Sequence, residues 1–125
     1  MGATWNRELL FDLGTKLALQ AKSKSGQVIL GPVLNLHRDP RGGRNFESFG
    51  EDPLLAGDLG AALVNGIQSG GVAACPKHFV GNECETKRRV QNVVESTNGR
   101  LMREIYLAPW QVLLRNSDPM AIMTA

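Results

Sequence analysis

Residues 27–53 read QVILGPVLNLHRDPRGGRNFESFGEDP. Residues 27–36 form an apolar run that is typical of a short buried strand and too short for a buried helix. The residues from His37 onward gather more charges and turn-formers than a solvated connection needs. The stretch ends at Asp52-Pro53, where aspartate suits a helix N-cap and proline suits the first helical position. A strand, a charged loop and a helix in this order indicate one unit of an α/β fold.

The same alternation continues on both sides of this stretch. Residues 5–22 have helical periodicity, with Thr4 or Asn6 as the expected cap, and the helix after Asp52 should end at Gly70-Gly71. A second apolar strand is predicted at residues 72–80, and a third begins at residue 119. Between them, a helix over about residues 98–116 should be kinked or ended early by Pro109, because proline lacks a backbone donor.

Helical spacing also predicts which side chains of the first and third helices face the core. In the first helix these are Trp5, Leu9, Leu10, Leu13, Leu17 and Leu19, and in the third they are Leu101, Ile105, Tyr106 and Val112.

Apolar strands that alternate with helices indicate βαβ units and a parallel sheet covered on both faces. A doubly wound sheet and a (β/α) barrel both fit this pattern. Three strands are too few for either, because a barrel needs eight strands in ~250 residues. An apolar strand at the end of the chain would also leave an exposed edge, which natural proteins avoid. We therefore expect residues 1–125 to be an incomplete piece of a larger domain.

Composition excludes several classes of function. The chain has 125 residues, 42% of them hydrophobic, and a net charge of +2, which is too mild to indicate nucleic acid or a membrane surface as partner. No apolar run approaches the ~20 residues of a transmembrane helix, and no basic-then-apolar leader opens the chain. Cys75 and Cys84 do not suggest a disulfide framework, so the redox compartment stays open.

The candidate site lies where the predicted strands end, because ligands of parallel α/β folds bind at the C-terminal ends of strands. HRDPRGGRNFE follows the first strand, KHFVGNECETKRR ends the second, and Met123 lies on the third. Arg38, Asp39 and Arg41 can be explained as loop ion pairs of ~0–1 kcal/mol.

Arg44 follows two glycines that allow a sharp turn, and its guanidinium fits hydroxyls or a carboxylate, although spacing alone leaves a structural role equally open. His78 alone would more often be structural. The pair Lys77-His78 favours a site, because a lysine in an apolar strand requires a carboxylate or a ligand.

A metal site and a phosphate loop are both rejected. Cys75 and His78 have C-x-x-H spacing, but His37 and Cys84 do not supply a second pair of the usual zinc kind. Gly42-Gly43 does not open directly into a helix, so a phosphate cradle fails on its context. Both cysteines are expected to serve packing.

The motifs GPVLNLHRDPRGGRNFESFGEDPLLAG, KHFVGNECETKRR, LMREIYLAPW and AIMTA closely resemble family-3 glycoside hydrolases, most of all their β-glucosidase branch. The resemblance covers nearly the whole chain. It implies a partial TIM-type (β/α)8 barrel of about three βα units with parallel strands, an incomplete N-terminal barrel domain over residues 1–125. It also implies that Arg44, Lys77 and His78 bind hydroxyls of the sugar in the −1 subsite, where Met123 lines the wall. Arg88 or Arg89 provides a further arginine near the site.

The chemistry that the resemblance implies is retaining hydrolysis of terminal β-glucosyl or related bonds. The nucleophilic aspartate and the acid/base glutamate of the family would lie outside this chain, and Asp39, Glu47, Glu51 and Asp52 match structural positions. We therefore expect the isolated chain to be inactive, with no cofactor or metal, a small carbohydrate as substrate, and neither nucleic acid nor membrane as partner. Many relatives are secreted or periplasmic.

Two alternatives remain. One is a truncated, non-catalytic binding or assembly module. The other is a different α/β enzyme that binds a phosphorylated ligand.

Overall fold

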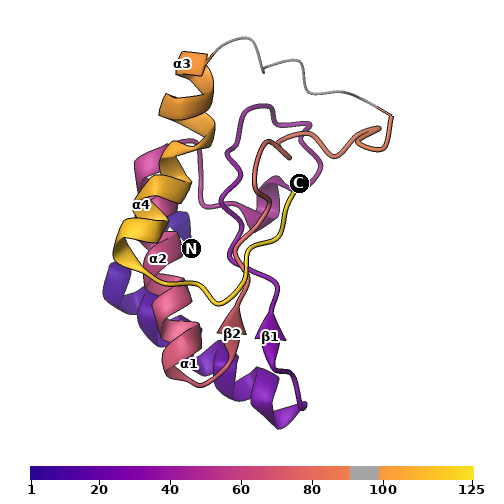
Figure 1. Ribbon diagram of the computed structural model, residues 1–125. Coiled ribbons are helices and arrows are strands. Elements are labelled where there is room, and N and C mark those ends of the chain that lie inside the picture. The colour runs from indigo at the N-terminus through magenta and orange to yellow at the C-terminus, as the bar shows by residue number, and fades with distance from the viewer. Residues whose placement is uncertain (91–98) are drawn as a thin grey trace.

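The computed structural model describes residues 1–90 and 99–125, so the predicted start of the third helix at residue 98 lies outside the described residues. Helices alternate with short parallel strands along the chain (Figure 1). The elements are η1 Gly2–Thr4, α1 Arg7–Ser23, β1 Val28–Ile29, η2 Asn45–Glu47, α2 Pro53–Ser69, β2 Ala73–Ala74, α3 Gly99–Leu101, η4 Met102–Tyr106 and α4 Ala108–Asn116.

The two long helices begin at the predicted caps. The Asn6 side chain accepts a hydrogen bond from the backbone N–H of Leu9 at 3.0 Å, and Asp52 Oδ1 accepts from that of Leu54 at 2.7 Å. Each side chain thereby satisfies a donor that the first turn of a helix leaves free. Both predicted starts are confirmed, with Asn6 rather than Thr4 as the cap of α1.

The buried face of α1 agrees with the prediction only in part, since Leu10 is buried and Leu13 and Leu17 pack against the core. Its buried residues are Leu10, Gly14 and Ala18, whereas the side chains of Trp5, Leu9 and Leu19 are exposed. The small residues allow α1 to approach α2 closely, because a Cβ on Gly14 would lie 2.7 Å from the Leu63 carbonyl oxygen. Close packing of the two backbones therefore explains why Gly14 and Ala18 are fully buried, while several larger apolar side chains of the helix are exposed.

The two strands are parallel, as predicted, but shorter. Val28 pairs with Ala73 and Ile29 with Ala74, and β1, α2 and β2 together form a strand–helix–strand unit. Beyond them the pairing of the two segments continues only as an isolated bridge between Val33 and Lys77. Proline cannot donate to a ladder, and Pro32 and Pro76 interrupt the predicted runs 27–36 and 72–80.

The third predicted helix is broken where proline requires it. Pro109 lies in the first turn of α4, and before it the backbone N–H of Leu107 donates to the Met102 carbonyl, five residues back. This π-type turn shifts the helical phase. The buried residues of α4 are Pro109, Trp110 and Leu113.

The predicted inner face of this helix is confirmed only in part, because Ile105 packs against the core and Val112 lies against Gly57 of α2. Its members Leu101, Ile105, Tyr106 and Val112 are only half-buried.

The third predicted strand, residues 119–125, forms a single bridge between Phe79 and Thr124. The core lies between the strands and the helices, and α2 and α4 run along one side of the strands (Figure 1). Val28 and Leu30 are exposed, so part of the strand surface is open to solvent. None of the described helices combines the length and apolarity needed to cross a membrane.

Candidate functional site

The two polar segments predicted to converge lie side by side. Val33 forms parallel bridges with Ser48 in the charged loop and with Lys77 at the end of the second strand segment. The backbone N–H of Leu34 donates to the Lys77 carbonyl at 2.7 Å, and that of Glu85 donates to the Gly42 carbonyl at 2.9 Å. These backbone bonds hold residues 33–50 against residues 77–85.

Arg44 and Lys77 share one carboxylate. Arg44 forms a two-bonded ion pair with Glu47, with Nε–Oε1 at 2.6 Å and Nη2–Oε2 at 2.8 Å, and Lys77 Nζ lies 3.4 Å from Glu47 Oε2. This hydrogen-bonded guanidinium is the main cause that lowers the pKa of Glu47. Lys77 thus has the carboxylate that its place in an apolar segment required.

His78 lies in the same cluster and is buried. Its backbone N–H donates to Asn35 Oδ1 at 3.0 Å, its Nδ1 lies 2.8 Å from the same oxygen, and its Nε2 lies 3.2 Å from Arg44 Nη1. Burial is the main cause that lowers the pKa of His78, and the nearby positive charges of Arg44 and Lys77 act in the same direction. Both effects favour the neutral form of the imidazole.

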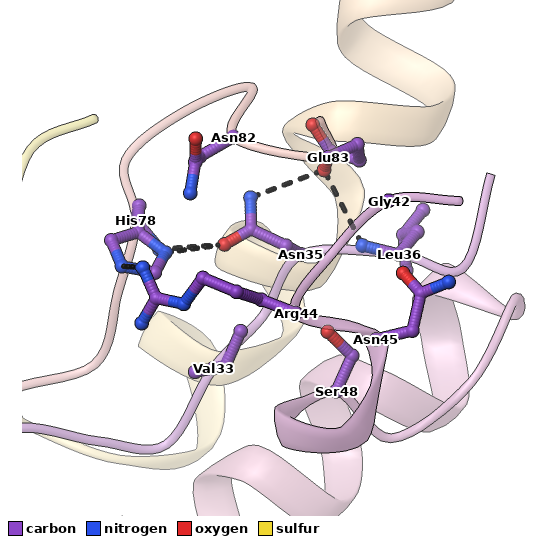
Figure 2. Close-up of a pocket in the computed structure, with 10 residues that line it drawn as sticks. All are labelled: Val33, Asn35, Leu36, Gly42, Arg44, Asn45, Ser48, His78, Asn82 and Glu83. Carbon is purple, nitrogen blue, oxygen red and sulfur yellow. Dashed lines mark hydrogen bonds between the residues drawn. The ribbon is translucent and has the colours of Figure 1, made fainter. Parts of the chain in front are cut away.

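The side chain of Asn35 lies between those of His78 and Glu83 (Figure 2). Asn35 Nδ2 donates to Glu83 Oε1 at 3.2 Å, and the backbone N–H of Leu36 donates to the same oxygen at 3.3 Å. Glu83 Oε2 is buried and accepts no hydrogen bond from the described residues. Burial raises the pKa of Glu83, because it penalises the charged form more than the neighbouring N–H groups stabilise it.

Arg88 and Met123 lie at the edges of the cluster. Arg88 Nε is 3.2 Å from Glu85 Oε1, and Glu85 Oε2 is 3.8 Å from Arg44 Nη1, so Glu85 connects the two arginines. The backbone of Met123 bonds to both Pro76 and Phe79, which places this residue beside the Lys77-His78 pair. All five residues from the sequence prediction therefore lie in or next to one cluster.

The cavity enclosed by the cluster is small, with a volume of about 10 Å³. That is room for about one water molecule and far too little for a sugar ring. A larger ligand would have to bind on the solvent side, where the side chains of Arg44 and Lys77 remain 27% and 14% exposed. Within residues 1–90 and 99–125, no three His, Cys, Asp or Glu side chains are grouped so that they could hold a metal ion.

Comparison with known proteins gives the family. The sequence model of the Glycosyl hydrolase family 3 N terminal domain matches residues 1–125. The chain belongs to glycosyl hydrolase family 3. Beta-glucosidase B of Emericella nidulans is 46% identical over 125 residues, which are 100% of this chain and 15% of that protein. The chain therefore spans about 15% of the length of this curated relative.

Solved structures of family-3 enzymes share the fold. The beta-glucosidase 3B of Thermotoga neapolitana in complex with glucose superimposes with a TM-score of 0.91 and 43% identity, over 99% of this chain and 17% of that one. The beta-glucosidase of Kluyveromyces marxianus in complex with glucose gives 0.91 and 44%, over 99% and 15%. These neighbours confirm the predicted partial (β/α) barrel.

The sequence does not single out three residues that hold the cluster together, namely Asn35, Glu83 and Glu85. The structural position predicted for Glu47 agrees with its ion pairs to Arg44 and Lys77. One signal was available for Asn35, because an amide in the middle of the apolar run VLNL needs a buried partner. The interpretation of Asp39 as an ion-pair residue is confirmed, since Arg41 binds both of its carboxylate oxygens and lowers the pKa of Asp39 to about 2.

Proposed function

We propose that the protein carrying this chain is a retaining β-glucosidase and that these residues form part of its −1 sugar subsite. The observation that supports this most directly is the convergence of Arg44, Lys77 and His78 from two separate segments on one cluster. In this proposal their polar atoms bind hydroxyls of the terminal glucose, with Met123 and Arg88 at its edge. Residues 1–125 are one segment of the N-terminal barrel domain.

The ion pairs of the cluster fit an uncharged sugar. Glu47 pairs with both Arg44 and Lys77, and Glu85 pairs with Arg88, so each of these cations already has a carboxylate partner. A phosphate would have to compete with these carboxylates for the same cations and would be repelled by them. A sugar hydroxyl can donate to one neighbour and accept from another without displacing either partner. The cluster therefore favours a sugar over a phosphorylated ligand.

Hydroxyl contacts of this kind speed glycoside hydrolysis when they strengthen in the oxocarbenium-like transition state. We expect the effect of removing one to appear in kcat/KM. A lost hydrogen bond to a charged group costs ~1.5–3 kcal/mol, which corresponds to about 10- to 150-fold.

The test is turnover of an aryl β-glucoside by the full-length protein and its Lys77→Ala variant. Lys16→Ala on α1 is a matched control, because it removes an exposed lysine outside the cluster. Loss of kcat/KM in Lys77→Ala alone would support the subsite. Equal activity in both variants would contradict it. Turnover by the isolated 125-residue chain, abolished by Lys77→Ala, would contradict the assignment of the catalytic acids to the rest of the protein.

A further inference from the structure

Asn35 forms a buried side-chain pair with His78, and the subsite proposal gives Asn35 no role. Each is only 5% exposed, and Asn35 lies between His78 on one side and Glu83 on the other (Figure 2). The polar atoms around this pair determine where its protons lie.

The orientation of the Asn35 amide is fixed at both ends. The atom that faces the backbone N–H of His78 at 3.0 Å must be the oxygen, because an amide nitrogen there would oppose a second donor. The other end lies 3.2 Å from Glu83 Oε1, so it must be the NH₂ group, which can donate to that oxygen. Both contacts independently require the same orientation.

The protons of the imidazole then follow. Asn35 Oδ1 can only accept, so Nδ1 of His78, 2.8 Å away, must carry a hydrogen. The guanidinium of Arg44 can only donate, so Nε2, 3.2 Å from Nη1, must be without one. The neutral ring is thus the tautomer protonated at Nδ1, and its Nε2 accepts from Arg44.

We propose that Asn35, held by Glu83, is a positioning residue that fixes His78 as the Nδ1-protonated tautomer, so that its Nε2 accepts a hydrogen bond from Arg44 and orients this guanidinium. The effect on a ligand, through Arg44, rests on the proposed sugar subsite, whereas the tautomer does not. A doubly protonated ring would turn an N–H toward Arg44 and lose the acceptor. The charged groups that face this ring are Arg44, Lys77, Glu47 and Glu85, and the first two disfavour its protonation.

The perturbation that separates this role from simple packing is Asn35→Asp. Aspartate has almost the same shape and still accepts from the N–H groups of His78, but its negative charge favours the protonated ring. The new carboxylate would also face the carboxyl group of Glu83, and repulsion between the two would destabilise the single variant. The double variant Asn35→Asp/Glu83→Gln restores a donor at position 83 and keeps the new charge beside His78. Asn65→Asp is the control, since Asn65 bonds to the Asn116 carbonyl outside the cluster.

The measurements use the full-length protein. Long-range ¹H–¹⁵N spectra of histidine-labelled protein, with His78 assigned by a His78→Asn variant, should show protonated Nδ1 and unprotonated Nε2. In both Asn35 variants the ring should titrate at higher pH, and the acid limb of the kcat/KM profile should move with it. Just above the wild-type limb we expect about a tenfold loss, the effect of a shift of about one pH unit. Asn65→Asp should leave the limb in place.

A protonated Nε2 in the neutral wild-type ring would overturn the inference, and so would a folded double variant with unchanged His78 titration. If the expected tautomer is found but no aryl glycoside is turned over, the proton assignment stands and the proposed sugar subsite fails. If glucosides are turned over while the ring has the other tautomer, the subsite proposal stands and the role of Asn35 fails.

Discussion

Glu47 is the residue on which the cluster depends most, because one carboxylate holds two cations. Its contacts are the two bonds to Arg44, at 2.6 and 2.8 Å, and the ion pair with Lys77 at 3.4 Å. Breaking a buried ion pair costs ~3–5 kcal/mol because a charge is left without its partner. The Glu47 side chain is 21% exposed, so solvent reduces this cost. We expect Glu47→Gln to weaken the interaction free energy of Glu47 with Arg44 and Lys77 by ~2–4 kcal/mol.

The assay is kcat/KM of the full-length protein on an aryl β-glucoside. If the whole loss affects the positioning of Arg44 and Lys77, ~2–4 kcal/mol corresponds to a decrease in kcat/KM of about 30- to 1,000-fold. Glu51→Gln in the same loop is the control, because Glu51 is exposed. Equal kcat/KM in Glu47→Gln and wild type would refute the reasoning. In Glu47→Ala, which leaves space for a small anion, restoration of turnover by azide would instead make Glu47 the nucleophile and refute its assignment as a holding group.

Two further predictions concern stability, both measured by thermal unfolding of the full-length protein. Burial raises the pKa of Glu83, so its ionisation costs folding free energy as pH rises from the ordinary carboxyl range through the raised value. Glu83→Gln should therefore stabilise the protein at pH 7 and lose that advantage below pH ~4, whereas a pH-independent difference would contradict this. Gly66→Ala should destabilise by ~1–3 kcal/mol, because its Cβ would overlap the Phe11 carbonyl oxygen in α1, despite the ~1 kcal/mol that alanine gains in a helix. Gly99→Ala, whose Cβ would have no atom of residues 1–90 or 101–125 within 4 Å apart from the backbone of its own helix, should not, and equal effects of the two alanines would rule out the proposed overlap.

The features that the sequence predicted well are local ones. The caps Asn6 and Asp52 and the stop near Gly70 depend on a few consecutive residues, so each could be recognised within one helical turn. The meeting of Arg44 with Lys77 is not local, but parallel topology predicts it, because the ends of neighbouring parallel strands lie at one edge. Chain order and strand direction were sufficient for that part of the site.

The features that were missed depend on three-dimensional partners. The buried stripe of α1 follows Gly14 and Ala18, since close approach of α2 decides it and hydrophobicity alone does not. Glu83 cannot be recognised as buried from NECE, because its burial comes from Asn35 and Leu36, more than forty positions away along the chain. Polar groups that support other polar groups leave little trace in a single sequence.

The acids of the cluster also bear on how the proposed hydrolysis would be divided within the protein. Retaining hydrolysis needs two carboxyl groups ~5–5.5 Å apart that flank the bond to be cleaved, one free to attack and one able to donate a proton. Glu47 holds Arg44 and Lys77, Glu85 holds Arg88, and Glu83 lies behind His78 with its carboxyl buried. Each of these three carboxyl groups therefore has a supporting task. Attack by Glu47 or Glu85 would release the cation that it holds, and attack by Glu83 would require its carboxyl group to become exposed. We accordingly expect the nucleophile and the acid to come from elsewhere in the protein, which fits a chain that spans only 15% of its curated relative.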